Sequence, residues 1–120
     1  NIHIADMVEA YMVLLRAPKE KIAGQIFNAG YENQSVKDIA EIVKNTVGSD
    51  VKLITTPTDD NRSYHISSNK IKTELGFVAK HTIKDAVEGL CEAFDKKLLP
   101  NSLEDQMYFN IKRMQNISLS

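Results

Sequence analysis

Two short polar patterns, each followed by apolar residues at helical spacing, constrain this 120-residue chain more than any other feature. Ser35 to Asp38 and Thr82 to Asp85 both place a hydroxyl three residues before a carboxylate, the spacing with which two side chains satisfy free amides at a helix N-terminus. The apolar residues that follow are Val36, Ile39, Ala40, Val43 and Val47 after the first pattern, and Ile83, Ala86, Val87, Leu90 and Phe94 after the second. Both patterns therefore predict the start of an amphipathic helix.

Two further helices are expected on weaker signals. The first runs from about Asp6, a favourable N-cap residue, to Arg16. Its apolar stripe consists of Val8, Tyr11, Met12 and Leu15. A brief helix is expected over residues 67–75, capped by one of the two serines that open it and closed by Gly76. The tail after Pro100 is polar with scattered apolar residues, and it fits a helix or an extended arm equally well.

Two segments between the helices are expected to be short strands. Residues 25–29 lie between two glycines, and residues 51–55 alternate in side-chain character. Helices that follow strands with long crossovers favour parallel pairing. The predicted fold class is therefore α/β, a small mixed domain of about four helices packed on a few short strands. We expect one domain over residues 1–99 and a C-terminal tail over residues 100–120.

The composition argues against several classes of protein. Fifteen basic and sixteen acidic residues give a formal net charge of −1, so no bulk attraction to nucleic acid or to an anionic membrane is expected. Cys91 is the single cysteine and the three histidines are far apart in sequence, so neither a disulfide nor a metal site is expected. No apolar run approaches the roughly 20 residues of a membrane helix. Because the chain starts at Asn1 without a signal-peptide pattern, we expect a processed product or a fragment of a larger protein. The lone, unpaired cysteine is consistent with a cytoplasmic parent protein.

Candidate catalytic and binding groups are few. Tyr108 and Lys112 have the spacing with which a lysine assists proton transfer by a tyrosine, but no cofactor-binding strand–loop–helix precedes them, so we interpret the match as coincidence. Arg62 lies in the polar loop at residues 57–64 and could bind a phosphate with paired hydrogen bonds or form an ion pair with a neighbouring aspartate. Tyr64 could contact a ligand or pack against the protein.

Four segments, taken in order, resemble a known family. Residues 2–10 resemble the motif I-H-V-x-D-V-A-x-A, and residues 27–40 resemble F-N-x-G followed by S-x-x-E-L-A. Residues 62–71 resemble R-x-Y-x-x-D-x-x-K-I, and residues 75–90 resemble L-G-F-x-P-x-x-x-L-x-x-G-L. These are motifs of the extended short-chain dehydrogenases/reductases, the NAD-dependent sugar-nucleotide epimerases and dehydratases. The similarity covers residues 1–97 and corresponds to the smaller, C-terminal substrate domain of that family.

The resemblance implies a domain that binds a nucleotide-diphosphate sugar and works with an N-terminal Rossmann domain that is missing here. In the family that missing part binds NAD(P) and carries the catalytic groups, so the resemblance implies no catalytic residue, no cofactor and little activity in this fragment. Arg62 matches the arginine of D-x-R-x-Y and would contact the diphosphate. Asn33 falls where some members place a polar residue near the nucleotide, and Tyr64 completes the candidate substrate-binding set.

The sequence departs from the family pattern at one point, and one alternative function stays open. Many family members carry an arginine in an R-P-G-D turn, which residues 55–59 lack, so the nucleotide and its binding mode stay open. The alternative function is a stand-alone, non-enzymatic interaction module whose first and last helices bind partner helices. A homodimer is a further arrangement consistent with such apolar helix faces.

Overall fold

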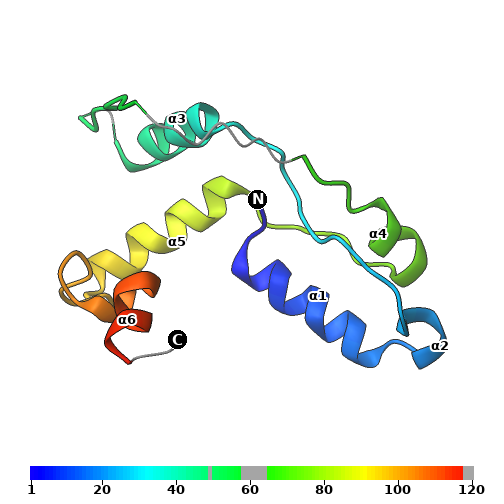
Figure 1. Cartoon of the computed structure of the whole chain (residues 1–120). Coiled ribbons are helices and arrows are strands. Elements are labelled where there is room, and N and C mark those ends of the chain that lie inside the picture. Colours follow the sequence, from blue (N-terminus) through cyan, green and yellow to red (C-terminus); the bar gives the residue numbers. More distant parts are fainter. Residues whose placement is uncertain (49, 58–64, 118–120) are drawn as a thin grey trace. The chain divides into compact units, whose positions relative to one another are not determined.

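The computed structural model describes residues 1–48, 50–57 and 65–117 (Figure 1). The chain divides into two compact units, Asn1–Gly89 and Leu90–Ser120, and each is described by itself. The elements in chain order are α1 (Ile4–Arg16), α2 (Lys19–Ile22), α3 (Val36–Val47), α4 (Asn69–Leu75), α5 (Ile83–Asp95), the 3₁₀ helix η1 (Gln106–Tyr108) and α6 (Asn110–Asn116). The predicted α/β class is wrong, since the described residues contain helices and no β-strand.

The segments predicted as strands are present as irregular chain without strand pairing. Residues 25–29 and 51–55 belong to no β-ladder, and the Ile26 side chain is 82% exposed. A strand needs a neighbouring strand to accept and donate its backbone hydrogen bonds, and side-chain alternation alone does not supply one. A side chain holds the first segment instead, because Lys70 Nζ donates to Gln25 Oε1 at 2.8 Å and to the Ile26 carbonyl at 3.2 Å.

Both predicted capping boxes form. The Ser35 hydroxyl accepts from the Asp38 amide at 3.1 Å, and the Asp38 carboxylate accepts from the Ser35 amide at 3.2 Å. At the start of α5 the corresponding distances between Thr82 and Asp85 are 3.1 and 2.7 Å. These bonds lower the pKa of both carboxyls: the hydroxyl and amide of Ser35 donate to Asp38, and the amide and hydroxyl of Thr82 donate to Asp85.

The start of α1 differs from the prediction. The helix begins at Ile4, and His3 is the N-cap residue, with its Nδ1 accepting from the Ala5 amide at 3.1 Å. Asp6 lies inside the first turn and is buried, so its prediction as the N-cap is wrong. The reason is a long-range one, because the carboxylate of Asp6 binds a segment some 75 residues further along the chain.

The core of the first unit is small. Its main cluster of buried apolar residues comprises Ala10 of α1, Ile71 of α4, Phe77 and Ala79, and Ile71 is completely buried. The apolar residues packed against them are Ile2, Val13, Phe27, Ala29 and Leu75. Val87 of α5 is buried as well. Gly76 ends α4 with a φ of 74°, the left-handed conformation that glycine adopts at low cost. The predicted short helix with inward Ile71 and a closing glycine is confirmed.

The second unit carries the end of α5, η1 and α6. In the tail the chain forms short helical turns, so the helical option is the one the structure adopts. Asp105 starts η1, with its Oδ1 accepting from the Met107 amide at 2.9 Å. Of the α5 residues expected to face inward, Val87 is buried, whereas Leu90 and Phe94 are about half exposed.

Candidate functional site

A cleft of about 450 Å³ lies beside the turn at Gly30 in the first unit. Its described lining comprises Gly30, Tyr31, Asn33, His65, Ile66, Ser67, Ser68, Asn69, Lys72, Phe77, Val78 and Ala79. The volume falls within the range of ligand pockets, about 300–1,000 Å³. No Asp or Glu occurs among these described lining residues, while Lys72 and His65 are basic and several others carry hydroxyl or amide groups. Such a lining suits an anionic ligand rich in hydrogen-bond acceptors.

Asn33 lies in this cleft, as a substrate-binding residue would, but part of its amide is already engaged. Its Nδ2 donates to the Ile66 carbonyl at 2.9 Å, and its Oδ1 accepts from the Ile66 amide at 3.2 Å. The side chain therefore pairs with the backbone of Ile66 much as a neighbouring strand would. One amide hydrogen and one lone pair of Asn33 remain for a ligand.

The other two predicted substrate-binding residues, Arg62 and Tyr64, lie outside the described residues, so their roles stay predictions. The residues that follow them in sequence, His65 and Ile66, line the cleft.

Ser68 and Gly30 form a contact that sequence reasoning missed. The Ser68 hydroxyl donates to the Gly30 carbonyl and accepts from the Gly30 amide, both at 2.8 Å. Because that hydroxyl is engaged 38 residues away, Ser68 makes no side-chain capping bond at the start of α4. A Cβ on Gly30 would lie 2.3 Å from Ile66 Cδ1, so glycine allows the two segments to approach closely. The contact between Ser68 and Gly30 joins residues 38 positions apart, so no short sequence pattern predicts it.

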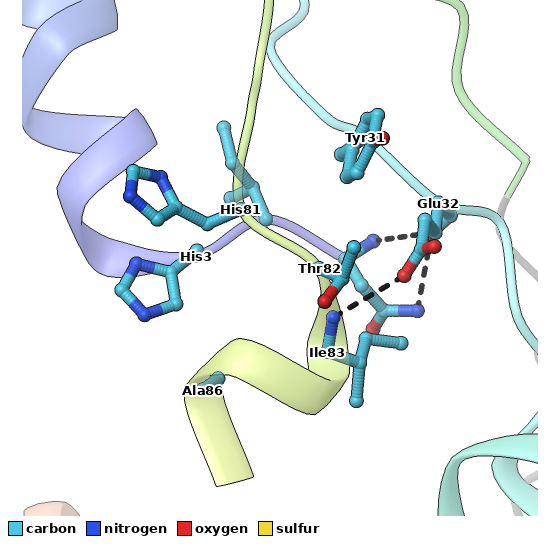
Figure 2. Close-up of a pocket in the computed structure, with 9 residues that line it drawn as sticks. His3, Tyr31, Glu32, His81, Thr82, Ile83 and Ala86 are labelled. Atoms are coloured by element: carbon cyan, nitrogen blue, oxygen red, sulfur yellow. Dashed lines mark hydrogen bonds between the residues drawn. The ribbon is translucent and has the colours of Figure 1, made fainter. Parts of the chain in front are cut away.

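A second, smaller hollow lies where the starts of α1 and α5 approach each other within the first unit (Figure 2). Its volume is about 70 Å³, room for a few water molecules and far below that of a nucleotide-sugar pocket. The rings of His3 and His81 stack on one side with their centroids 4.8 Å apart. On the other side, Glu32 Oε2 accepts from the Ile83 amide at 3.3 Å.

Asp6 of α1 binds the segment that precedes α5. Its Oδ2 accepts from the backbone amides of Lys80 at 3.0 Å and His81 at 2.8 Å, and its Oδ1 lies 2.9 Å from His81 Nδ1. Burial raises the pKa of Asp6, but the hydrogen bonds from His81 and Lys80 outweigh it, so the net pKa is lowered. Asp6 is therefore a structural carboxylate that fixes the chain before α5 onto α1.

Other candidate sites find no supporting geometry in the part of the chain that the structure describes. No group of three or more His, Cys, Asp or Glu side chains there could hold a metal ion. Tyr108 lies in η1 and Lys112 in α6, and Lys112 Nζ lies 4.4 Å from the ring centroid of Phe109. Within the same residues, no helix combines the length and the apolar character needed to cross a bilayer.

Two curated plant proteins are similar to this chain. "Putative UDP-arabinose 4-epimerase 2" of Arabidopsis thaliana is 34% identical over 84 residues, which is 68% of this chain and 20% of the relative. UDP-arabinose 4-epimerase 1 of the same plant is 32% identical over 91 residues, 72% of this chain and 22% of the relative. The chain thus spans about a fifth of the length of the relatives it matches. No family model matches the chain, and no solved structure matches it.

These similarities indicate that the chain is related to part of a sugar-nucleotide epimerase.

Proposed function

We propose that this chain is the substrate-binding part of an NAD-dependent sugar-nucleotide epimerase or dehydratase, and that its ligand is a nucleotide-diphosphate sugar. The observation that carries the proposal is the cleft beside Gly30, whose size suits such a ligand and whose described lining offers hydrogen-bond donors and no carboxylate. The names of the two relatives support a UDP-sugar as the first ligand to test.

The chain would bind the ligand through charge and hydrogen bonding. Lys72 and His65 line the cleft and would lie near the diphosphate, where the ammonium of Lys72 would supply positive charge and the imidazole of His65 a hydrogen bond. Asn33 would offer its remaining amide hydrogen to the nucleotide or sugar. Arg62 and Tyr64 remain in the proposed set, with Arg62 donating paired hydrogen bonds to the diphosphate.

The redox step would belong to a different part of the enzyme. The five glycines of this chain stand singly, so the sequence has no glycine-rich loop to hold a dinucleotide, and the residues present do not fit NAD(P). We therefore assign this chain no catalytic residue. A Rossmann domain would hold the cofactor and form the second wall of the substrate site, in a parent enzyme that we expect to be cytoplasmic.

Calorimetry with UDP-arabinose tests the proposal. The chain alone should give no measurable heat, because half of the site is missing, whereas the chain assembled with the remainder of an epimerase should bind. In that assembly Lys72→Ala should weaken binding about tenfold, the loss of roughly one charge-assisted hydrogen bond. Lys84→Ala is the matched control, since Lys84 lies on α5 away from the lining of the cleft.

Two results would count against the proposal. Micromolar binding by the isolated chain would show that the site is complete without a partner. An assembled protein that binds no UDP-sugar would show that the cleft serves another ligand.

A stand-alone interaction module remains the second candidate, and the exposed apolar face of α1 is the observation that favours it.

A further inference from the structure

The rings of His3 and His81 form a stacked pair at the start of α1 (Figure 2). Their centroids lie 4.8 Å apart and the ring planes differ by 25°. Both residues and the groups that they bind lie in the first unit, so the whole arrangement belongs to one compact body. Neither ring is among the described lining residues of the cleft beside Gly30, so the proposed function gives the pair no role.

His3 caps α1 through a nitrogen that carries no proton. The Ala5 amide donates to His3 Nδ1 at 3.1 Å, and only an imidazole nitrogen without a hydrogen accepts such a bond. A protonated imidazole carries a hydrogen on both nitrogens and would turn a donor toward the Ala5 donor. It would also place positive charge at the N-terminus of α1, where the helix dipole favours negative charge. Protonation of His3 therefore removes the cap.

His81 is held by a carboxylate and responds to a proton in the opposite way. Burial alone would raise the pKa of Asp6, but its hydrogen bonds lower it, so Asp6 is ionised at neutral pH. Its Oδ1 lies 2.9 Å from His81 Nδ1, and an ionised carboxylate only accepts, so that nitrogen of His81 carries the hydrogen. A proton added to Nε2 of His81 leaves this bond in place and adds an attraction of opposite charges. It also puts a positive charge against the face of the His3 ring.

The other ionisable groups that face the pair do not replace the lost cap. They are the carboxylates of Asp6, Asp85 and Glu32 and the amino group of Asn1. Asp85 accepts from the amide and the hydroxyl of Thr82, and Glu32 Oε2 accepts from the Ile83 amide. These carboxylates offset part of the repulsion between two charged rings. Each is bound elsewhere, however, and the Ala5 amide would be left without the acceptor that His3 supplies.

We propose that His3, stacked on His81, is a pH-sensitive cap that releases the first turn of α1 as the pH falls from neutral to mildly acidic values. Histidine is the side chain that ordinarily gains its proton between about pH 8 and pH 5. The pKa values of Asp6 and Asp85 are lowered, so these carboxyls stay ionised over that range and do not cause the change. The inference goes beyond the proposed function and does not depend on the ligand of the cleft.

Urea denaturation of the full chain at pH 7.5 and pH 5.5 tests the proposal. His3→Asn replaces the imidazole with an uncharged side chain that is a favoured N-cap residue. The unfolded wild-type chain takes up the proton on His3 freely, whereas the folded chain must give up the cap, so the stability of the wild type should fall with the pH. The ratio of the unfolding equilibrium constants of the wild type and His3→Asn should rise about fivefold between the two pH values, the usual effect of losing an N-cap.

His65→Asn is the matched control, because His65 is the remaining histidine and lines the cleft instead. The ratio for this variant should be the same at both pH values. NMR of the ¹⁵N-labelled wild-type chain gives a second readout, which does not depend on a variant. The Ala5 amide signal should shift in step with the ring signals of His3 as the pH falls from 7.5 to 5.5. The Asp38 amide, which donates to the Ser35 hydroxyl at the start of α3, should not shift.

Three results would overturn the inference. One is a ratio for His3→Asn that stays constant between the two pH values. Another is an equal change of the ratio for His65→Asn, which would show that the effect is not specific to the pair. The third is an Ala5 amide signal that stays unmoved while the ring of His3 titrates.

Discussion

Replacing Asp6 with leucine should destabilise the first unit, because one substitution removes three hydrogen bonds that join α1 to the chain before α5. The Asp6 carboxylate accepts from the backbone amides of Lys80 and His81 and lies 2.9 Å from His81 Nδ1. Leucine has a comparable volume but no acceptor. The two backbone amides would then lose their partner in a partly buried position.

The expected cost follows from those two donors. A buried donor left without a partner costs about 1–3 kcal/mol, and since these two are only partly buried we expect Asp6→Leu to cost about 3 kcal/mol in total. Asp6→Asn keeps an oxygen for the two backbone amides, and His81 can take the tautomer that accepts from the new amide group. That variant loses the charge but few hydrogen bonds, so we expect a cost of about 1 kcal/mol.

Urea denaturation at neutral pH, followed by circular dichroism, measures both changes. Glu9→Leu is the matched control, because Glu9 is an exposed acidic residue on the same helix. It should change the free energy of unfolding by less than about 0.5 kcal/mol. The reasoning is refuted if Asp6→Leu costs no more than Glu9→Leu, or if Asp6→Asn costs as much as Asp6→Leu.

Three further predictions concern the turn at Gly30, the end of α4 and the response to acid. Ser68→Ala should lower the free energy of unfolding by about 1–2 kcal/mol, because it removes two hydrogen bonds to Gly30. Ser67→Ala should have little effect. Equal losses of stability for the two variants in thermal denaturation would contradict this prediction. Gly76→Ala should cost about 1 kcal/mol, since its φ of 74° strains any residue with a Cβ, and an unchanged melting temperature would argue against that strain. The folded-state pKa values of Asp38 and Asp85 lie below the ordinary 3.8, so their contribution is present above that pH and is lost as the pH falls through the lower folded values. Replacing both by Asn should reduce the fall in the free energy of unfolding as the pH drops below about 4, measured by urea denaturation at a series of pH values. An unchanged fall would show that other groups cause it.

Local features of the fold were predictable from the sequence. The capping boxes at Ser35 and Thr82 join residues three apart, and the glycine after α4 follows the helix it closes, so a short window contains each complete interaction. These predictions are confirmed because their partners are close in sequence.

Long-range features were not predictable in this way. The local sequence predicts Asp6 as an N-cap. In the structure its carboxylate accepts a hydrogen bond from the amide of His81, some 75 residues later, and His3 caps the helix. The alternation at residues 51–55 resembles a strand, yet a strand forms only when a partner lies beside it, and none does among the described residues.

The candidate site was predictable in part. The family resemblance pointed to Asn33, which lines the cleft, but not to its pairing with the backbone of Ile66. Lys72 carried no signal, because an isolated lysine on a short helix is indistinguishable from a solvated surface residue until the fold places it beside the cleft.

The most direct test of the central claim is a titration of the ¹⁵N-labelled chain with UDP-arabinose, followed by NMR up to millimolar concentrations of the ligand. Weak binding that calorimetry misses should shift the amide signals of Gly30, Ser67 and Val78, which line the cleft, and leave those of the second unit unmoved. Shifts confined to residues outside the cleft, or none at the highest concentration, would contradict a sugar-nucleotide site in this chain.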